Sequence, residues 1–463
     1  MTHLHDGTPT WGAPAGKQWE WNKLKVHTDM LKNYFKQAWT LMRQNRLFTG
    51  IYVVGTGLSI ALVMTLFIIF YVKFGPVYPE YNRDRTLVVK PVKRYPKGKP
   101  ENWNIYGGVA YYVVDQMLPG LPHVEQVAGS VIDFWGDYQV SATDVKPFKA
   151  TPRFANGAFW KVFSFRFVDG QPFTQEDVEA KAQVAVIGES LAKRLFAAVE
   201  GVTGRHFAFN GRDYRVCGVV RDVSNVTPET AGDLWLPLLN AQYISKELDR
   251  QGLLGNVFVS LLVDDAENFE TVRSEVQDVF RRYTQQDKDY EYDLMGQPDP
   301  YWLSTFRQDV EKAPDTMELA KDFLYILLAL LFIPALNLSG MISSRMDSRI
   351  AELGIRKAYG ATRRRLLEQV LCENLLLTLL GGLAGLLFSY LIVLTASDWI
   401  LTLFDKNIYD TSLSTSLTPE MLFNPAVFGC ALAVCVVLNV VSALVPALGA
   451  MRHPIMESLN TKR

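Results

Sequence analysis

The pattern of hydrophobic and polar positions divides the chain into four uncharged apolar runs and one long segment of mixed polarity. The runs cover residues 47–72, 323–344, 374–397 and 425–451. Each is long enough to cross a bilayer, which takes about 20 apolar residues in a helix. The mixed segment, residues 73–322, lies between the first and second runs. The pattern therefore predicts a membrane α-helical protein with four transmembrane helices and one large domain outside the bilayer.

Within the mixed segment, strand-like and helix-like patterns alternate. Strands are predicted at 86–92 and 124–132, with a helix at 110–118 between them. The arrangement returns later, with strands at 257–263 and 289–294. The helix between those strands places apolar residues on one face: Phe269, Val272, Val276, Val279, Phe280 and Tyr283. Two strand–helix–strand units of this kind predict an α+β domain over residues 75–313.

An insertion is predicted between these two units, at about residues 165–250. Phe207 and Phe209 lead into Asn210-Gly211, and Tyr214 follows. Asn-Gly between alternating apolar residues is a strong hairpin signal. We therefore expect an inserted subdomain that contains a β-hairpin.

The segments that flank the first two spans also have helical patterns. Residues 1–22 are polar and predicted to be a disordered tail rather than a signal peptide, and residues 23–46 form an amphipathic helix. Its apolar face contains Leu31, Tyr34, Phe35, Ala38, Trp39 and Met42. A surface for a soluble partner is the alternative, but the span that follows favours a helix in the cytoplasmic membrane interface. Pro314-Asp315-Thr316 predicts a helix start, so residues 314–344 combine a stalk with the second span.

Charge sets the expected orientation. The connection at 345–373 carries seven Lys and Arg residues, whereas the connection at 398–424 carries only Lys406. Positive residues in short loops favour the cytoplasmic side. We therefore expect both termini, including the tail at 452–463, in the cytoplasm of a multi-pass inner-membrane protein, with the large domain outside.

Several function classes lose support from what the sequence contains. No Gly-x4-Gly-Lys-Ser/Thr phosphate loop occurs, no predicted span carries a charge, and all six histidines lie outside the spans. The four cysteines have no disulfide or metal spacing, and the net charge of −1 gives no nucleic-acid signal. We therefore name no catalytic, cofactor-binding or metal-binding residue, and expect no enzyme activity in this chain.

The connection at 345–373 is the most distinctive stretch of the chain. It is charge-dense, and its apolar residues recur at helical spacing, interrupted by Gly354 and Gly360. We expect two short helices along the membrane face. The alternative hypothesis is that its positive residues only hold this connection in the cytoplasm. Anchoring does not require the sequence Glu-Leu-Gly-Ile-Arg-Lys that begins at Glu352, nor the Tyr-Gly-Ala-Thr that begins at Tyr359.

These residues resemble the signature of the MacB/FtsX-like permeases of ABC systems: an acidic residue before Gly-Ile-Arg-Lys, a Gly-Ala-Ser/Thr turn, a basic amphipathic stretch, and a span that opens with Gly381 and Gly382. In that family this connection is a coupling element that docks on a separate ATPase subunit. The resemblance implies coupling roles for Glu352, Leu353, Gly354, Ile355, Arg356, Lys357, Tyr359, Gly360, Ala361 and Thr362.

The resemblance also implies the function and the partners. The chain is expected to be the permease subunit of an ATP-driven system without a fused ATPase, coupling ATP hydrolysis to movement of a MacB-like core domain. ATP is bound by the partner subunit. The cargo is amphiphilic, peptide-like or a lipoprotein. The alternative is FtsX-type mechanotransmission, which switches a cell-wall or signalling partner without moving cargo. Expected partners are an ABC ATPase, a second permease copy or paralogue in a dimer, membrane lipid, and an outer-membrane or periplasmic protein.

Overall fold

The computed structural model describes residues 36, 39–40, 42–44, 46–99, 104–133, 136–242, 244, 252–307, 311–326, 328–329, 332, 355–356, 358–404 and 424–452. The chain divides into two compact units. The helical unit comprises residues 1–66, 324–392 and 425–463, and the β-rich unit comprises residues 67–323 and 393–424.

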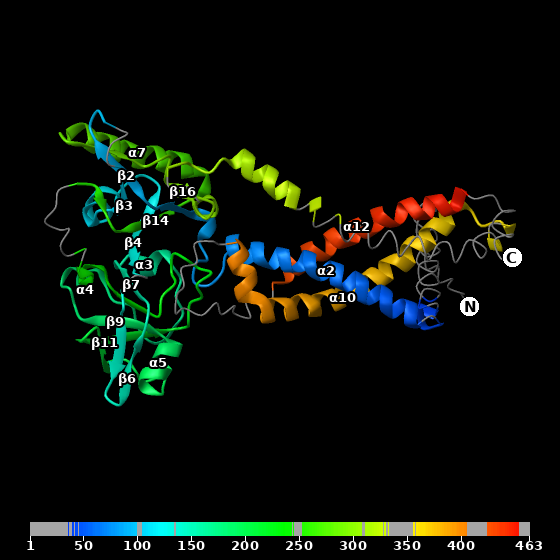
Figure 1. The fold of residues 1–463 in the computed structure, drawn as a ribbon, viewed down its shortest axis with the longest axis horizontal. Helices are drawn as coiled ribbons and strands as arrows, with labels where there is room; N and C mark the ends of the chain where they lie inside the picture. The colour runs from blue at the N-terminus through cyan, green and yellow to red at the C-terminus, as the bar shows by residue number, and fades with distance from the viewer. Residues whose placement is uncertain are drawn as a thin grey trace, which may run out of the picture. The chain divides into compact units, whose positions relative to one another are not determined.

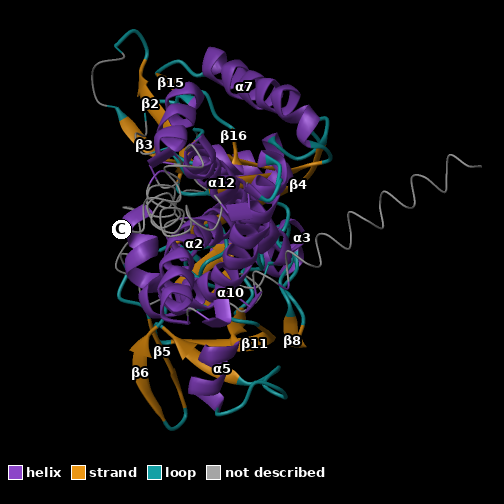
Figure 2. Ribbon diagram, turned by 90° about the vertical axis from the view of Figure 1, so that its right-hand side faces the viewer, coloured by secondary structure: helices purple, strands orange, loops and turns teal. Residues whose placement is uncertain are grey.

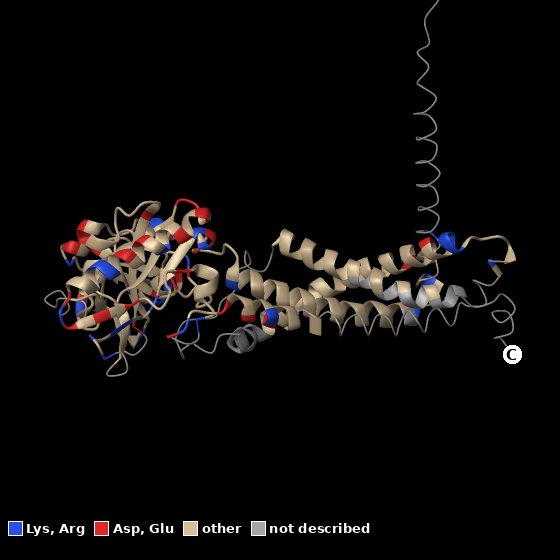
Figure 3. Cartoon of the chain, turned by 90° about the horizontal axis from the view of Figure 1, so that it is seen from above, with Lys and Arg blue, Asp and Glu red and all other residues tan. Residues whose placement is uncertain are grey.

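Three long helices dominate the apolar parts of the chain: α2 (Arg46–Phe74), α10 (Arg363–Phe404) and α12 (Pro425–Arg452) (Figure 1). Within the described residues, 49–74 and 363–395 are long and apolar enough to cross a membrane, and 425–437 is a shorter apolar helix. Most of the predicted second span lies outside the described residues. Figure 3 shows few charged residues along these helices and many over the β-rich unit.

Small residues allow α2 and α10 to pack closely. A Cβ atom added to Gly57 would lie 3.1 Å from the Cβ of Ala384, and one added to Gly385 would lie 2.8 Å from the carbonyl oxygen of Gly57. Contacts of this kind let two backbones approach, as is common between helices in membranes. Met42, Tyr52, Val370, Leu376 and Leu377 form a buried cluster between the N-terminal part of α2, the segment before it, and α10.

The helix boundaries differ from the expectation at both ends of α10, which extends to Phe404 although the third span is predicted to end at residue 397. Helix α10 begins at Arg363 and continues through residue 374, where the predicted third span begins. The second of the two expected short helices is therefore the first part of α10. No Gly or Pro interrupts residues 363–380, so nothing in the sequence stops the helix there. A helix begins at Thr316, where Pro314-Asp315-Thr316 predicts a helix start, and the Asp315 carboxylate accepts a hydrogen bond from the Met317 backbone N–H at 2.8 Å.

The β-rich unit contains two sheets. The larger has twelve strands in the order β16-β1-β14-β4-β7-β12-β9-β11-β10-β5-β6, with β8 paired to β11, and the smaller has the order β13-β3-β2-β15. The strands of the larger sheet are β1 (Thr86–Val89), β4 (Val124–Ile132), β5 (Gln139–Ala142), β6 (Val145–Lys149), β7 (Pro152–Ala155), β8 (Phe167–Gly170), β9 (Val184–Gly188), β10 (His206–Phe209), β11 (Arg212–Val220), β12 (Leu234–Pro237), β14 (Phe258–Val263) and β16 (Asp299–Pro300). Those of the smaller sheet are β2 (Val92–Pro96), β3 (Ile105–Val109), β13 (Leu254–Gly255) and β15 (Tyr290–Asp293).

Short and long helices cover these sheets: α3 (Phe159–Val162), α4 (Gln175–Glu179), α5 (Glu189–Phe196), α7 (Phe269–Gln286) and α8 (Tyr301–Ser304). Helix α7 packs beside β15, where the rings of Tyr283 and Tyr292 meet edge to face at 5.9 Å (Figure 2). A short π-helical turn, Val113–Met117, occupies the place of the helix predicted at 110–118. The α+β class of this domain is confirmed.

The predicted hairpin is also confirmed, and the insertion has an unexpected relation to the rest of the sheet. Asn210 and Gly211 both have positive φ, 49° and 76°, as a type I′ turn requires. Strand β12 pairs with both β7 and β9, so the insertion extends the same sheet instead of forming one of its own. Strands β2 and β3 were not expected; in β3, Gly107-Gly108 interrupts the strand pattern of the sequence.

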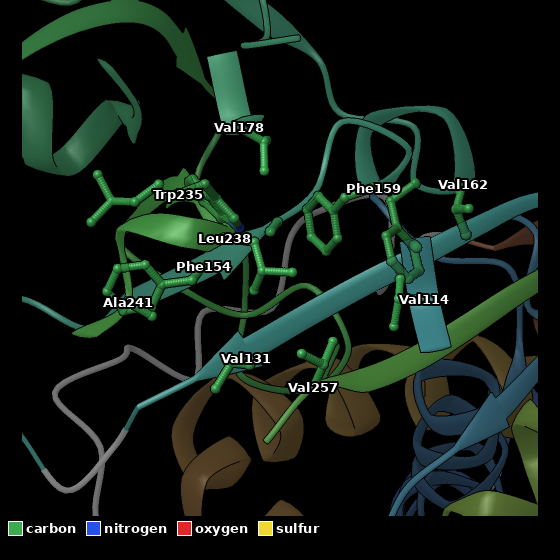
Figure 4. Close-up of a cluster of buried hydrophobic side chains, with 14 of the residues drawn as sticks. Val114, Val131, Phe154, Phe159, Val162, Val178, Trp235, Leu238, Ala241 and Val257 are labelled. Carbon is green, nitrogen blue, oxygen red and sulfur yellow. The ribbon is translucent and has the colours of Figure 1, made fainter. Parts of the chain in front are cut away.

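The core of the β-rich unit lies along the middle of the larger sheet. Phe154, Phe159 and Trp235 are 3%, 0% and 0% exposed, and Figure 4 shows them among smaller aliphatic side chains such as Leu238. Aromatic contacts reinforce the cluster, including Phe159 with Phe163 at 4.9 Å. The core therefore joins the strands of the predicted two-unit domain to those of the insertion.

Candidate functional site

The described part of the candidate site is a helix–turn–helix at residues 355–370, which we call the coupling turn. Its first helix ends in a Schellman motif: the Ala361 N–H donates to the Arg356 carbonyl at 3.0 Å, and Gly360 has a φ of +89°. A left-handed residue at this position favours glycine, because a Cβ atom would be strained there. The Gly-Ala pair of the sequence signature is thus a helix stop.

The next residue of the signature is a helix start. The Thr362 Oγ1 accepts a hydrogen bond from the Arg365 N–H at 3.4 Å, and the Thr362 carbonyl accepts one from the Leu366 N–H at 3.2 Å. This is an N-cap, which satisfies an otherwise unpaired donor of the first turn of α10. Gly360, Ala361 and Thr362 together change the chain direction within three residues.

One side-chain bond crosses the turn. The Arg356 Nη1 donates to the Gln369 Oε1 at 2.5 Å, which links the first helix to the second turn of α10. Sequence reasoning named Arg356 and missed Gln369. No local pattern relates residues thirteen positions apart, and only the folded turn brings them together.

The coupling turn is amphipathic. Leu366 and Val370 are 3% and 6% exposed, and Val370 belongs to the cluster with Met42. In the first helix and at its end, by contrast, Ile355 is 47% exposed and Tyr359 is 90% exposed. These two residues lie four positions apart, so they share one face of the helix. The turn thus presents an aromatic and an aliphatic side chain on a backbone held by its caps.

Basic residues lie next to this exposed pair. Arg363, Arg364 and Arg365 are all exposed at the start of α10, and Arg364 pairs with Glu368 at 3.0 Å. Exposed helix pairs of this kind contribute little to stability, about 0.3–0.5 kcal/mol. The apolar pair and the basic residues make a surface suited to a protein groove that is partly apolar and partly acidic.

The structure does not describe every residue that the sequence analysis singled out. Glu352, Leu353, Gly354 and Lys357 lie outside the described residues. Ile355, Arg356, Tyr359, Gly360, Ala361 and Thr362 are described, and all lie in the one turn.

Reactive chemistry is not evident in the described part of the chain. No group of three or more His, Cys, Asp or Glu side chains there is placed to hold a metal ion. Burial raises the pKa of the Cys217 thiol to about 12, which keeps it protonated and unreactive near neutral pH.

Comparison with known families identifies both parts of the chain. Residues 49–279 match the MacB-like periplasmic core domain, and residues 324–455 match the FtsX-like permease C-terminal domain. The chain belongs to the MacB/FtsX-like ABC permeases. It is therefore a membrane protein with an extracytoplasmic core domain.

The relatives of this permease include export proteins. The chain is 24% identical over 391 residues to the macrolide export ATP-binding/permease protein MacB of Hahella chejuensis, covering 83% of this chain and 54% of that protein. It is 23% identical over 277 residues to the uncharacterized ABC transporter permease YknZ of Bacillus subtilis, covering 59% of this chain and 64% of that protein. The permease thus spans about half the length of the first of these relatives. A solved periplasmic region of MacB from Actinobacillus actinomycetemcomitans aligns with a TM-score of 0.33 and 19% identity, over 45% of this chain and 87% of that one.

Proposed function

We propose that this permease couples ATP hydrolysis by a separate ABC ATPase subunit to movement of its extracytoplasmic domain, and so exports or releases an amphiphilic or peptide-like substrate. In this proposal the ATPase subunit binds the nucleotide and hydrolyses it, and the permease transmits the resulting movement. The observation that carries the proposal is the coupling turn, a backbone-capped turn that presents Ile355 and Tyr359 next to a basic helix start.

Exposure of this apolar pair is the first step of the argument. Transfer of apolar area from water is favourable by about 25 cal/mol per Å², so a tyrosine that is 90% exposed is available to contribute to binding. Tyrosine is also enriched among residues that dominate binding energy. Positive charge in the loop is enough to set the membrane topology, and neither Ile355 nor Tyr359 contributes to that charge.

Rigidity is the second step. A coupling element transmits force only if its docking surface keeps its geometry when the partner moves. The Schellman motif, the Thr362 cap and the Arg356–Gln369 bond fix the docking face relative to α10, which continues into the predicted third span. A displacement of the turn is thus expected to move a transmembrane helix directly.

The topology and assembly follow from the same proposal. We propose four spans, with residues 75–313 outside and both termini in the cytoplasm. ABC ATPases act as a pair, so two docking turns are needed, and the functional unit contains two permease subunits. The relative named as a macrolide exporter supports an amphiphilic cargo for this chain.

The test is co-purification with the ATPase in mild detergent, together with permease-stimulated ATP turnover. Ile355→Ser and Tyr359→Ser are expected to weaken association roughly tenfold each, or about 1.4 kcal/mol, and to lower stimulated turnover accordingly. Arg364→Lys is the matched control, because it preserves the charge of an exposed neighbour. Wild-type association in both serine variants would show that the turn only anchors topology.

A further inference from the structure

A second polar cluster lies where α2 ends. Residues 67–74, its last two turns, belong to the same compact unit as the β-rich domain. The last carbonyls of a helix lack intrahelical donors. Here the Arg83 Nη1 donates to the Val72 carbonyl at 2.7 Å and to the Gly75 carbonyl at 3.0 Å. The Arg83 side chain is 2% exposed, so a buried cation from the domain caps the end of the first transmembrane helix.

Glu80 connects this cap to two other parts of the domain. Its Oε2 accepts hydrogen bonds from the Arg83 Nε at 2.9 Å and from the Tyr301 hydroxyl at 2.7 Å, and its Oε1 accepts one from Thr230 at 2.9 Å. The Arg83 guanidinium also lies over the Tyr301 ring, 4.6 Å from its centroid. One carboxylate therefore joins the end of α2, the loop before β12 and helix α8.

The loop before β12 is itself held from the other side. The Arg153 Nε donates to the Ala231 carbonyl at 2.8 Å and its Nη2 to the Pro228 carbonyl at 2.6 Å, and the Trp235 indole donates to the Thr230 carbonyl at 3.1 Å. Arg153 lies in β7 and Trp235 in β12, at the centre of the larger sheet. The cluster at the helix end is thus bonded into the core of the domain.

An aromatic layer adds the start of the stalk helix to this cluster. The ring centroids of Phe74 in α2 and Phe306 lie 5.3 Å apart, and those of Phe306 and Phe323 also lie 5.3 Å apart. Phe323 lies in the helix that begins at Thr316 and is the first residue of the second apolar run. Phe70 also contacts Phe323, at 5.4 Å. Phe306 lies two residues after the end of α8, which contains Tyr301. Because the Tyr301 hydroxyl donates to Glu80, α8 connects this aromatic layer to the polar cluster. Both chain segments that enter the domain from the predicted spans meet at one place.

A buried ion pair is an inefficient way to gain stability, because desolvation of the charges offsets much of their attraction. Its directional bonds do fix geometry, and the Arg83 cap adds bonds to backbone atoms that a hydrophobic residue could not make. We propose that Arg83 and Glu80 are positioning residues that clamp the last two turns of α2 and the helix that begins at Thr316 to the extracytoplasmic domain, so that these helix ends move together with the domain. The use of that movement rests on the proposed function, whereas the clamp itself does not.

Hydrogen exchange of the full-length protein in detergent tests the clamp without any ATPase. In the double variant Glu80→Gln/Arg83→Met, which leaves no unpaired charge between the two residues, amide exchange over residues 72–82 is expected to speed up roughly tenfold. Strands β4 and β14 should keep their protection. Arg85→Met is the matched control, because Arg85 forms an exposed pair with Glu125 at 3.0 Å and makes none of the bonds to the end of α2.

Wild-type protection over residues 72–82 in a folded double variant would overturn the clamp. If β4 and β14 lose protection as well, the double variant has destabilised the whole domain. The same measurement on Tyr301→Phe then tests the clamp, since this variant removes only the hydroxyl bond to Glu80. A smaller acceleration confined to residues 72–82 supports the clamp, and unchanged exchange in that variant overturns it. Failure of the proposed function is distinguishable from failure of the clamp. It would appear as wild-type ATPase association in the Ile355→Ser and Tyr359→Ser variants, and it would not change the exchange results over residues 72–82.

Discussion

Two tyrosines show how differently the coupling turn and the clamp are built. Tyr359 is 90% exposed, and its backbone is held by bonds to residues within the same turn. Tyr301 is 2% exposed and bonds to Glu80, which lies 221 positions away in the chain. The turn is a local structure with an unused surface, as a docking element requires. The clamp is a long-range structure with no free surface, as a fixed attachment requires.

Alanine substitution of the same two tyrosines is expected to give the largest contrast. Tyr301→Ala should lower the free energy of unfolding of the domain by about 3–5 kcal/mol, because it leaves a cavity and removes a partner of a buried carboxylate. Tyr359→Ala should change it by less than about 0.5 kcal/mol, since the side chain is in solvent. Denaturant unfolding followed by tryptophan fluorescence measures both. Equal effects would contradict the distinction between buried clamp and exposed turn.

The next largest effect is a pH dependence of the stability of the extracytoplasmic domain, caused by Asp233. Burial raises the pKa of Asp233 from 3.8 to about 6, although the Thr151 N–H donates to this carboxylate at 2.7 Å. The folded state therefore binds a proton more tightly than the unfolded state. The stability that this proton provides is complete below pH 4 and is lost as the pH rises through about 6.

Asp233→Asn mimics the protonated form and should therefore stabilise the domain at pH 7.5 by about 3 kcal/mol, with no difference from wild type at pH 4. Urea unfolding at the two pH values provides the measurement. A variant that is equally stable relative to wild type at both values would show that Asp233 titrates normally.

Gly360→Val should have an intermediate effect that is confined to the turn. A β-branched residue with positive φ costs about 1–3 kcal/mol, so the Schellman motif should open and misdirect the docking face. We expect ATPase association to weaken roughly tenfold, with unfolding of the domain unchanged. Gly98→Val is the control, since Gly98 has a φ of +70° in the domain. Loss of association in the control as well would point to a general defect.

The smallest effect is expected at the exposed ion pair of α10. Arg364→Lys keeps the positive charge next to Glu368 and should change ATPase association by less than about twofold, because exposed pairs contribute 0–1 kcal/mol. Binding of the purified ATPase measured by titration checks this. A larger loss would mean that the guanidinium itself, rather than the apolar pair, makes the contact.

The sequence predicted the coupling turn better than the clamp for a physical reason. Gly360 and Thr362 act through neighbouring backbone groups, so helix stop and start signals reveal them. Strands such as β4 and the Asn210-Gly211 hairpin also follow from local patterns. Glu80, Arg83 and Tyr301 have no shared local signal, because tertiary folding alone brings them together. For the same reason, the pairing of β12 with both β7 and β9 was not foreseen.

Site-specific photocrosslinking shows whether Tyr359 lies against the ATPase subunit in the assembled complex. A photoreactive phenylalanine analogue is introduced at Tyr359 in the full-length permease expressed with its ATPase, and the same analogue at Leu383, which is 59% exposed on the apolar part of α10, is the control. We expect a crosslinked permease–ATPase product from position 359 and none from position 383. No product from position 359, in a complex that still co-purifies, would contradict this expectation.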